Sequence, residues 1–219
     1  TSSNQIRLGN SNVTSLYSKA VYTATTTKAP NMYVDTNGQI MRSTASTGSS
    51  SHYVGELFDG GVVFYIDQTG IHGLICSMID LGTMIAWSNI SGTLIGSTAQ
   101  SDWDGQSNTN AIIGQSGHTG SAAKLCNDYV NVNYGTGVYS DWYLPSRGEL
   151  NILWNNLYPV QKALDSDGNS ATTVMGKGSN YWSSAEYNAS NAWGISFGDG
   201  SANFPAKNNL HAVRPVRAF

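Results

Sequence analysis

The chain has 219 residues, of which 40% are hydrophobic and only 11% are charged, against about 25% charged residues in an average soluble protein. Its formal net charge is −3 and its 11 Lys and Arg residues are scattered, which argues against nucleic-acid binding. The longest apolar stretches, at 61–66 and 73–84, are too short to span a bilayer, so membrane insertion is not expected.

The place of the missing charges is taken by Ser, Thr, Asn and Gly, a composition that suits a protein working outside the cell. The first residues, Thr1-Ser2-Ser3, do not form a basic and apolar leader. We therefore expect either the cut end of a longer chain or a protein that is released by lysis without secretion.

The first fifty residues differ from the rest of the chain. Their apolar residues are sparse, too few to close a core within one copy. Two short apolar runs within Met32–Met41 flank Asn37-Gly38, a pair that tolerates the positive φ angles of a tight turn, so a β-hairpin is predicted there. Residues 43–51 are nearly all Ser, Thr and Gly and predict a flexible joint. The predicted organisation is a small β-rich stalk segment at 1–50, followed by one domain at 51–219.

The domain at 51–219 begins with strand patterns. Apolar runs at 60–66 and 73–76 are separated by a turn and predict a buried hairpin. After residue 170 the chain returns to short strands with polar and Gly-rich connections.

Two helices are predicted between these sets of strands. Apolar residues recur at helical spacing over 121–130 and again over 146–164. Ser146 and Glu149 have the spacing of a capping box, and Pro159 is expected to bend or end the second helix. The fold class that follows is α+β, with two helices and short twisted antiparallel strands.

Three segments together resemble the C-type-lectin-like domains of the formylglycine-generating-enzyme type. They are GGVVFYIDQTGIHGLIC at 60–76, DWYLPSRGEL at 141–150 and NYWSSAEYNASNAWGISFGDGSANFPAKNNLHAVRPVRAF at 180–219. The resemblance covers residues 55–219 and implies a C-type-lectin-like fold.

The last of these segments also resembles the variable proteins of diversity-generating retroelements, which keep a framework and rewrite the positions within it. The framework residues include Trp182, Trp193 and Phe197. The resemblance implies a ligand-binding surface made of the residues in the variable slots. These twelve variable positions are Gly194, Ser196, Asp199, Ser201, Asn203, Phe204, Pro205, Ala206, Asn208, Asn209, Leu210 and His211.

Residues 1–45 are similar to segments that precede the terminal domains of phage tail-fibre proteins. Such segments usually form trimers. This resemblance implies a homotrimer through residues 1–45 and a location on the virion, as part of a phage tail, or otherwise outside the cell.

The residues that could carry metal or covalent chemistry lack the necessary spacing. The four histidines form no His-x-His or His-Glu-x-x-His pattern, and Cys76 and Cys126 form no Cys-x-x-Cys pair and are expected to be buried free thiols. The run at 165–169 resembles the start of a calcium loop, but its glycine, Gly168, is at the fourth position instead of the sixth, and no Glu stands at residue 176. A formylglycine-generating type of enzyme needs paired reactive cysteines in its C-terminal part, and none follows Cys126. We therefore expect no metal site, no cofactor and no catalytic residues.

Several large or charged residues near the C-terminus are better explained as structure than as a site. Trp142, Trp182, Trp193 and Phe197 occupy framework positions and are predicted to lie in the core. Arg214 and Arg217 alternate with valines on a predicted strand, and each is expected to form a structural ion pair with Glu186 or Asp141.

Three functions compete for this sequence: a receptor-binding domain, an enzyme of the same fold, and a purely structural fibre cap. The missing nucleophile, metal ligands and cysteine pair argue against the enzyme. The mixture of Asn, Ser, Phe, His and Pro at 201–212 argues against a structural cap. The sequence therefore favours a receptor-binding tip that recognises a bacterial cell-surface protein or glycan.

Overall fold

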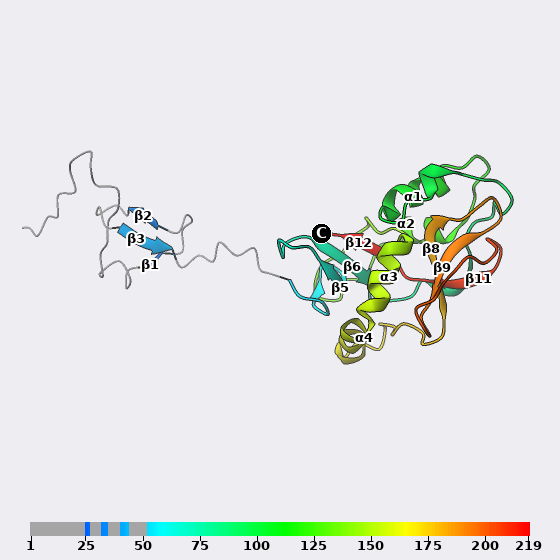
Figure 1. Ribbon diagram of the computed structural model, residues 1–219. Coiled ribbons are helices and arrows are strands. Elements are labelled where there is room, and N and C mark those ends of the chain that lie inside the picture. Colours follow the sequence, from blue (N-terminus) through cyan, green and yellow to red (C-terminus); the bar gives the residue numbers. More distant parts are fainter. Residues whose placement is uncertain (1–24, 27–31, 35–39, 44–51) are drawn as a thin grey trace, which may run out of the picture. The chain divides into compact units, whose positions relative to one another are not determined.

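The computed structural model describes residues 25–26, 32–34, 40–43 and 52–219, the first three ranges by their backbone alone (Figure 1). The chain divides into two compact units, Thr1–Ser49 and Ser50–Phe219.

The first unit contains a three-stranded sheet of order β1-β3-β2, with β1 at Thr25–Thr26, β2 at Met32–Val34 and β3 at Ile40–Ser43. The antiparallel pairing of β2 with β3 confirms the predicted pair of hairpin strands. The Asn37-Gly38 turn, the joint after Ser43 and the predicted trimer contacts fall outside the described residues.

The second unit is built from two sheets and four α-helices, which confirms the α+β class. A five-stranded sheet has the order β10-β9-β8-β11-β7, and a four-stranded sheet has the order β12-β6-β5-β4. The strands are β4 (Leu57–Phe58), β5 (Gly61–Ile66), β6 (Gly73–Ser77), β7 (Gly82–Ala86), β8 (Asn180–Glu186), β9 (Ala192–Ser196), β10 (Ala202–Asn203), β11 (Leu210–Val213) and β12 (Val216–Ala218). The predicted hairpin is confirmed as the antiparallel pair β5 and β6.

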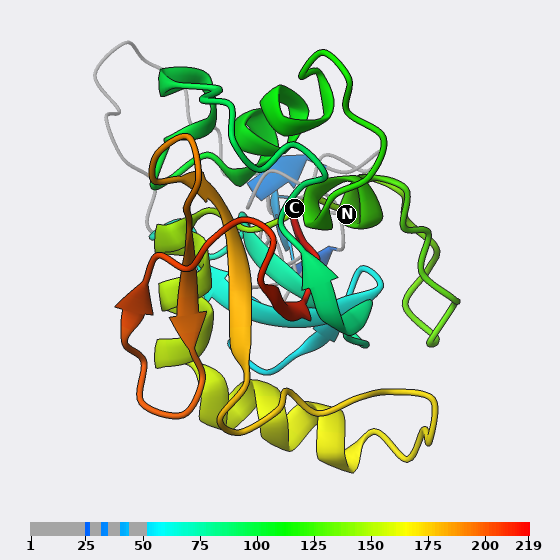
Figure 2. The same ribbon diagram turned by 90° about the vertical axis from the view of Figure 1, so that its right-hand side faces the viewer.

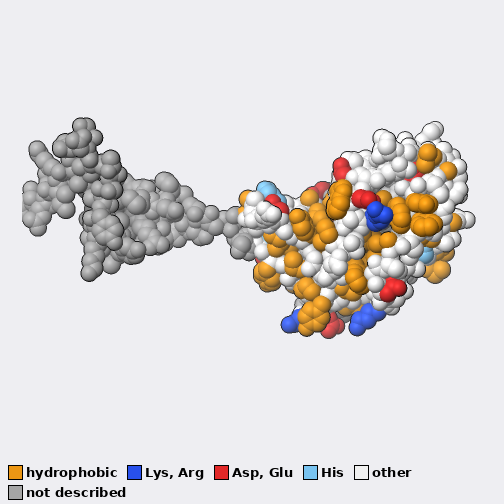
Figure 3. Space-filling view, viewed as in Figure 1, with side chains coloured by type: hydrophobic (Ala, Val, Ile, Leu, Met, Phe, Trp, Pro, Cys, Tyr) orange, Lys and Arg blue, Asp and Glu red, His pale blue; other side chains and the backbone are white. Residues whose placement is uncertain are grey.

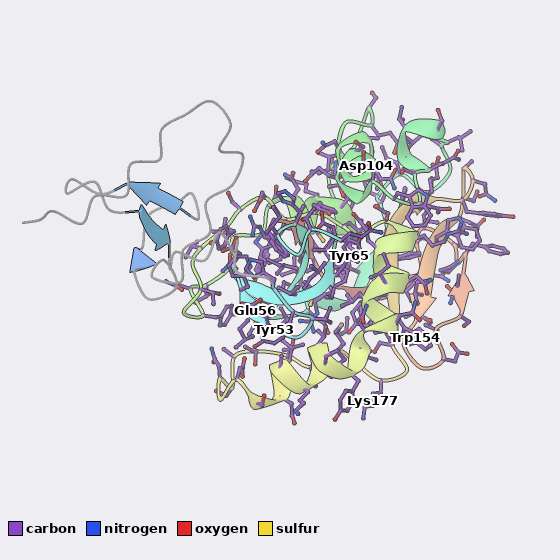
Figure 4. The ribbon with its side chains drawn as sticks, turned by 60° about the vertical axis from the view of Figure 1, so that its left-hand side comes forward. Tyr53, Glu56, Tyr65, Asp104, Trp154 and Lys177 are labelled. Carbon is purple, nitrogen blue, oxygen red and sulfur yellow. The ribbon has the colours of Figure 1, made fainter. Side chains whose placement is uncertain are left out.

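The helices are α1 (Gly105–Ile113), α2 (Ala122–Asn127), α3 (Arg147–Asn155) and α4 (Leu157–Ser166), with a short 3-10 turn at Ser97–Ala99. The expectation of two helices was therefore too low. The helix α1, which follows Asp104 (Figure 4), escaped prediction because the side that it buries includes the polar residues Asn108 and Thr109 and so breaks the apolar period.

The long helix predicted at 146–164 is two helices. The capping box of Ser146 and Glu149 is present at the start of α3, as predicted. The break comes at Asn156, before Pro159 is reached, and Pro159 becomes the third residue of α4. Its missing N–H costs nothing in the first turn of a helix, where that N–H has no partner within the helix.

Alternation along β8 sends its side chains into two separate clusters of the core. Tyr181 packs with Leu150 and Leu153 of α3 in the first cluster. Trp182 packs with Trp87 and Ile112 in the second cluster, beside α1 and α2. The five-stranded sheet is thus covered by α3 on one side and partly covered by the α1 and α2 region on the other, and Figure 2 shows β8, β9 and β10 side by side with α3 behind them.

The buried thiols and one of the ion pairs are as predicted. Cys76 and Cys126 are both free and fully buried, and burial raises the pKa of the Cys76 thiol to about 11. The Arg217 guanidinium donates two hydrogen bonds to the Asp141 carboxylate, from Nε to Oδ1 at 2.7 Å and from Nη2 to Oδ2 at 2.9 Å. Arg214 pairs at 2.8 Å with Asp80 and not with Glu186 or Asp141 as expected, since Glu186 is held by Lys207 and Asp141 by Arg217.

The prediction of a buried core position is confirmed for Trp142, Trp182 and Phe197 but is wrong for Trp193. The indole of Trp193 is partly exposed, because the side chains that pack on it, Tyr187, Phe204 and Arg147, are themselves at least partly exposed. It therefore belongs to the surface described in the next section.

The two tryptophans should differ in their effect on stability. Trp182→Ala empties a fully buried site and should lower the free energy of unfolding by about 3 to 5 kcal/mol. Trp193→Ala removes surface contacts only and should cost about 1 to 2 kcal/mol. Urea denaturation of both variants, followed by circular dichroism, measures the difference, and equal losses would contradict the assignment of Trp193 to the surface.

Candidate functional site

The candidate site is the surface formed by β9, β10 and the segment that leads into β11. The turn between β9 and β10 is tight against α3: Gly200 has φ +77°, and a Cβ there would lie 2.5 Å from the Trp154 ring. Figure 4 shows Trp154 at the end of α3, beside these strands. The carboxylate of Asp199 closes the turn by accepting from the Ser201 N–H at 3.0 Å and from its hydroxyl at 2.8 Å, which lowers the pKa of Asp199.

A buried lysine holds the segment between β10 and β11. Lys207 is fully buried, and its Nζ donates to Glu186 Oε1 at 2.6 Å and to the Thr93 carbonyl at 3.2 Å. The ammonium also lies 4.8 Å from the centre of the Trp87 ring. The Glu186 carboxylate in turn accepts backbone N–H groups from Ile95 and Gly96. Both buried charges are therefore compensated.

The backbone around Lys207 is pinned as well. Its N–H donates to the Ser190 carbonyl and its carbonyl accepts from the Trp87 N–H, each at 2.9 Å. The Asn191 amide donates to the Phe204 carbonyl at 2.9 Å. Because these bonds use main-chain atoms, the side chains before and after Lys207 do not determine the path of the segment.

The twelve variable positions lie almost entirely at the surface. Six of the side chains are exposed and five are partly exposed. Only Gly194 is buried, and it has no side chain. The exposed positions are Asp199, Ser201, Phe204, Asn208, Asn209 and Leu210, and the partly exposed ones are Ser196, Asn203, Pro205, Ala206 and His211.

The structure brings five of these positions together around a hollow of about 500 Å³. Asn203, Phe204, Pro205, Asn209 and His211 line it, with Asn180 and Ala202 completing the wall. Asp199 and Ser201 lie apart, at the tip of the β9–β10 hairpin.

The sheet register explains why the hollow forms. Asn203 faces Gly194, and Gly194 faces Trp182, so these residues share one side of the sheet. Since Gly194 has no side chain, the Asn203 side-chain amide reaches across β9, and its Nδ2 donates to the side-chain oxygen Oδ1 of Asn180 at 3.3 Å. His211 on β11 closes the far wall, with its ring edge-on to Trp182 at 4.5 Å between centroids.

An exposed aromatic ledge borders the hollow at Phe204. The Phe204 ring stacks on Tyr187 at 4.4 Å, and Trp193 meets both rings edge-to-face at 5.4 and 5.2 Å. The Arg147 guanidinium lies 4.4 Å from the Trp193 ring centre and is held by Asp102. Phe204 is 49% and Tyr187 is 43% exposed, so the ledge, which we define as these three aromatic residues and Arg147, is open to solvent.

Sequence reasoning found one member of the ledge, Phe204, and missed the others. Trp193 was assigned to the core, and no sequence pattern links Tyr187 or Arg147 to it. Figure 3 shows hydrophobic side chains gathered in clusters on the face of the second unit that it presents, with few charged groups among them.

The described residues contain neither a cluster of metal ligands nor a helix that could span a membrane. Among them, no three His, Cys, Asp or Glu side chains lie close enough together to ligate a metal ion. The helices of this part of the chain are also too short or too polar to cross a bilayer.

Comparison with known proteins matches the chain to one protein family. The sequence profile described as the Lcl C-terminal domain matches residues 77–217, which is more than half of the chain. None of the curated proteins matches. A crystal structure of a fimbrial protein from Bacteroides ovatus is similar at 18% sequence identity with a TM-score of 0.44. That match covers 85% of this chain, and the chain spans 48% of the length of the fimbrial protein.

The buried ion pair should be far more costly to break than to replace. Lys207→Met leaves the Glu186 carboxylate buried without its partner and should lower the free energy of unfolding by about 3 to 5 kcal/mol. The double variant Lys207→Met with Glu186→Leu removes both charges and should recover part of this loss, because the Ile95 and Gly96 N–H groups then lose their acceptor. Thermal and urea unfolding of the single and double variants tests the point, and a double variant less stable than the single one would contradict it.

Proposed function

Because the chain belongs to the Lcl C-terminal domain family and displays the surface described above, we propose that it is the receptor-binding part of an adhesin and not an enzyme. The observation that carries the proposal is the separation of roles around Lys207. Main-chain bonds and a buried ion pair hold the segment at 203–211, while its other side chains are exposed or partly exposed. A surface built in this way can change its side chains without losing its fold.

The chemistry of the surface supports recognition. The ledge of Tyr187, Trp193, Phe204 and Arg147 is composed mainly of the residue types that contribute most to binding free energy at interfaces. The Asn and Ser side chains beside it can each both donate and accept hydrogen bonds. We propose that the ligand is a protein or glycan on a bacterial cell surface and that the chain works on a phage tail or elsewhere outside the cell.

The alternatives make different demands on the same residues. An enzyme of the formylglycine-generating kind needs reactive cysteines, whereas Cys76 and Cys126 are buried and their thiol pKa values are raised by burial. A purely structural cap needs no exposed aromatic ledge.

Loss of ledge side chains should weaken binding to cells. With a fluorescently labelled chain and a panel of bacterial strains, Phe204→Ala and Trp193→Ala should each reduce affinity for a bound strain by about 30-fold. Tyr53→Ala is the matched control, since Tyr53 is 64% exposed and belongs to neither the ledge nor the hollow. Failure to bind any strain would speak for a structural cap, and equal binding by all three variants would show that the ledge is not the binding site.

We also propose that residues 1–45 join three chains. Their apolar residues are too few to form a core within one chain, but three copies together can form one shared core. Three linked surfaces bind cells tightly even when each site is weak. Light scattering should give the mass of three chains for the intact protein and of one chain for a version that begins at Ser51. A monomeric intact chain over a wide concentration range would remove the trimer from the proposal.

A further inference from the structure

The hollow beside Phe204 contains polar atoms that the protein does not satisfy. Asn203 Oδ1 and His211 Nε2 are both buried, and neither has a hydrogen-bond partner within residues 52–219. A buried polar group without a partner costs about 1 to 3 kcal/mol. Other buried side-chain atoms within residues 52–219 also lack a partner, but only these two belong to residues that line the hollow. A ligand in the hollow would complete their hydrogen bonding once each side chain turns toward it.

The side chains of the wall define what that group must be. Asn180, Asn203 and Asn209 supply amides that both donate and accept, and no Asp, Glu, Lys or Arg lines the hollow. Burial lowers the pKa of His211 below its usual 6.5, so at pH 7 the imidazole is neutral and also both donates and accepts. Hydroxyl groups have the same double character, whereas a carboxylate or an ammonium would enter this wall without a counter-charge.

The rest of the wall is apolar. Phe204 and Pro205 line one part of the hollow, and the Phe204 ring is held in place by its stacking on Tyr187. A sugar ring presents C–H groups on its faces and hydroxyls around its edge, which matches an apolar wall opposite amides and an imidazole. The volume of about 500 Å³ lies within the range of small-molecule sites, about 300 to 1,000 Å³.

We propose that this hollow binds one residue of a neutral carbohydrate chain, with Asn203 and His211 hydrogen-bonded to its hydroxyls and Phe204 against its ring. The proposal rests on the receptor-binding function and names the class of ligand. A protein ligand on the aromatic ledge is the competing case. A glycan enters the hollow itself, whereas a protein docked on the ledge would leave Asn203 and His211 without partners.

The test is a titration of the intact isotope-labelled chain with single sugars, followed by NMR. The probes are methyl glycosides of neutral hexoses, 6-deoxyhexoses and N-acetylhexosamines, each to about 50 mM, since one sugar residue in an open site is expected to bind in the millimolar range. At least one probe should give saturable shifts at Asn203 and His211. Absence of saturable shifts for every probe, or shifts of equal strength with glucosamine and N-acetylneuraminic acid, would overturn the proposal.

Two variants and a matched control connect the shifts to the hollow. Asn203→Ala and His211→Phe should each weaken the binding of the responsive sugar by about tenfold or more, because each removes one hydrogen-bonding group. The phenyl ring in His211→Phe keeps the contact with Trp182, so the fold should be retained. Asn208→Ala is the control, since Asn208 is exposed on the same segment but does not line the hollow. Equal weakening by Asn208→Ala would contradict the assignment.

A cell-binding arm separates this proposal from the proposed function. Periodate oxidation of a bound strain should abolish binding, and protease treatment of the strain should not. If protease alone abolishes it, the domain is still a receptor-binding domain but its ligand is a protein, and the carbohydrate proposal fails. If no untreated strain is bound, the receptor-binding function itself fails, whereas binding that depends on neither Phe204 nor Asn203 would move the receptor site elsewhere and overturn the carbohydrate proposal.

Discussion

The ion pair between Lys207 and Glu186 is the constraint on which the surface of this domain depends. Both side chains are fully buried, and removal of either partner would leave a charge in the interior. Glu186 also ties down the backbone at Ile95 and Gly96, while Lys207 ties down Thr93. One pair of charges therefore joins β8, the loop before α1 and the segment between β10 and β11. The exposed side chains near Lys207 are therefore not needed to hold these segments together.

The two faces of the five-stranded sheet contribute to different parts of the domain. Tyr181 and Ile195 point to the core under α3, and Trp182 points to the second core cluster. Where that second cluster ends, the same face continues as the wall of the hollow through Asn180, Asn203 and His211. Trp182 belongs to both regions, since it is buried in the cluster and meets the imidazole edge-on. The core thus sets the position of a residue that we propose to contact a ligand.

The ledge and the hollow differ in composition but share Phe204. Tyr187, Trp193 and Arg147 lie outside the twelve variable positions, whereas Phe204 lies within them. Under the proposed function, the aromatic residues outside the predicted variable positions contribute to affinity, and the polar groups within those positions contribute to selectivity.

The sequence by itself determined what depends on neighbours along the chain. The capping box at Ser146 and Glu149, the β5–β6 hairpin and the pairing of β2 with β3 follow local patterns of capping, alternation and turn residues, and all three were predicted. Tertiary structure decided the features that depend on how helices and strands pack against one another. The helix α1 was missed because the side it buries includes polar residues. Trp193 was misplaced because the side chains that pack on it, Tyr187, Phe204 and Arg147, lie at the surface themselves. Arg214 pairs with Asp80 because Lys207 already holds Glu186. Composition shows that a charge or an indole needs a partner, but only the packed chain brings that partner within reach.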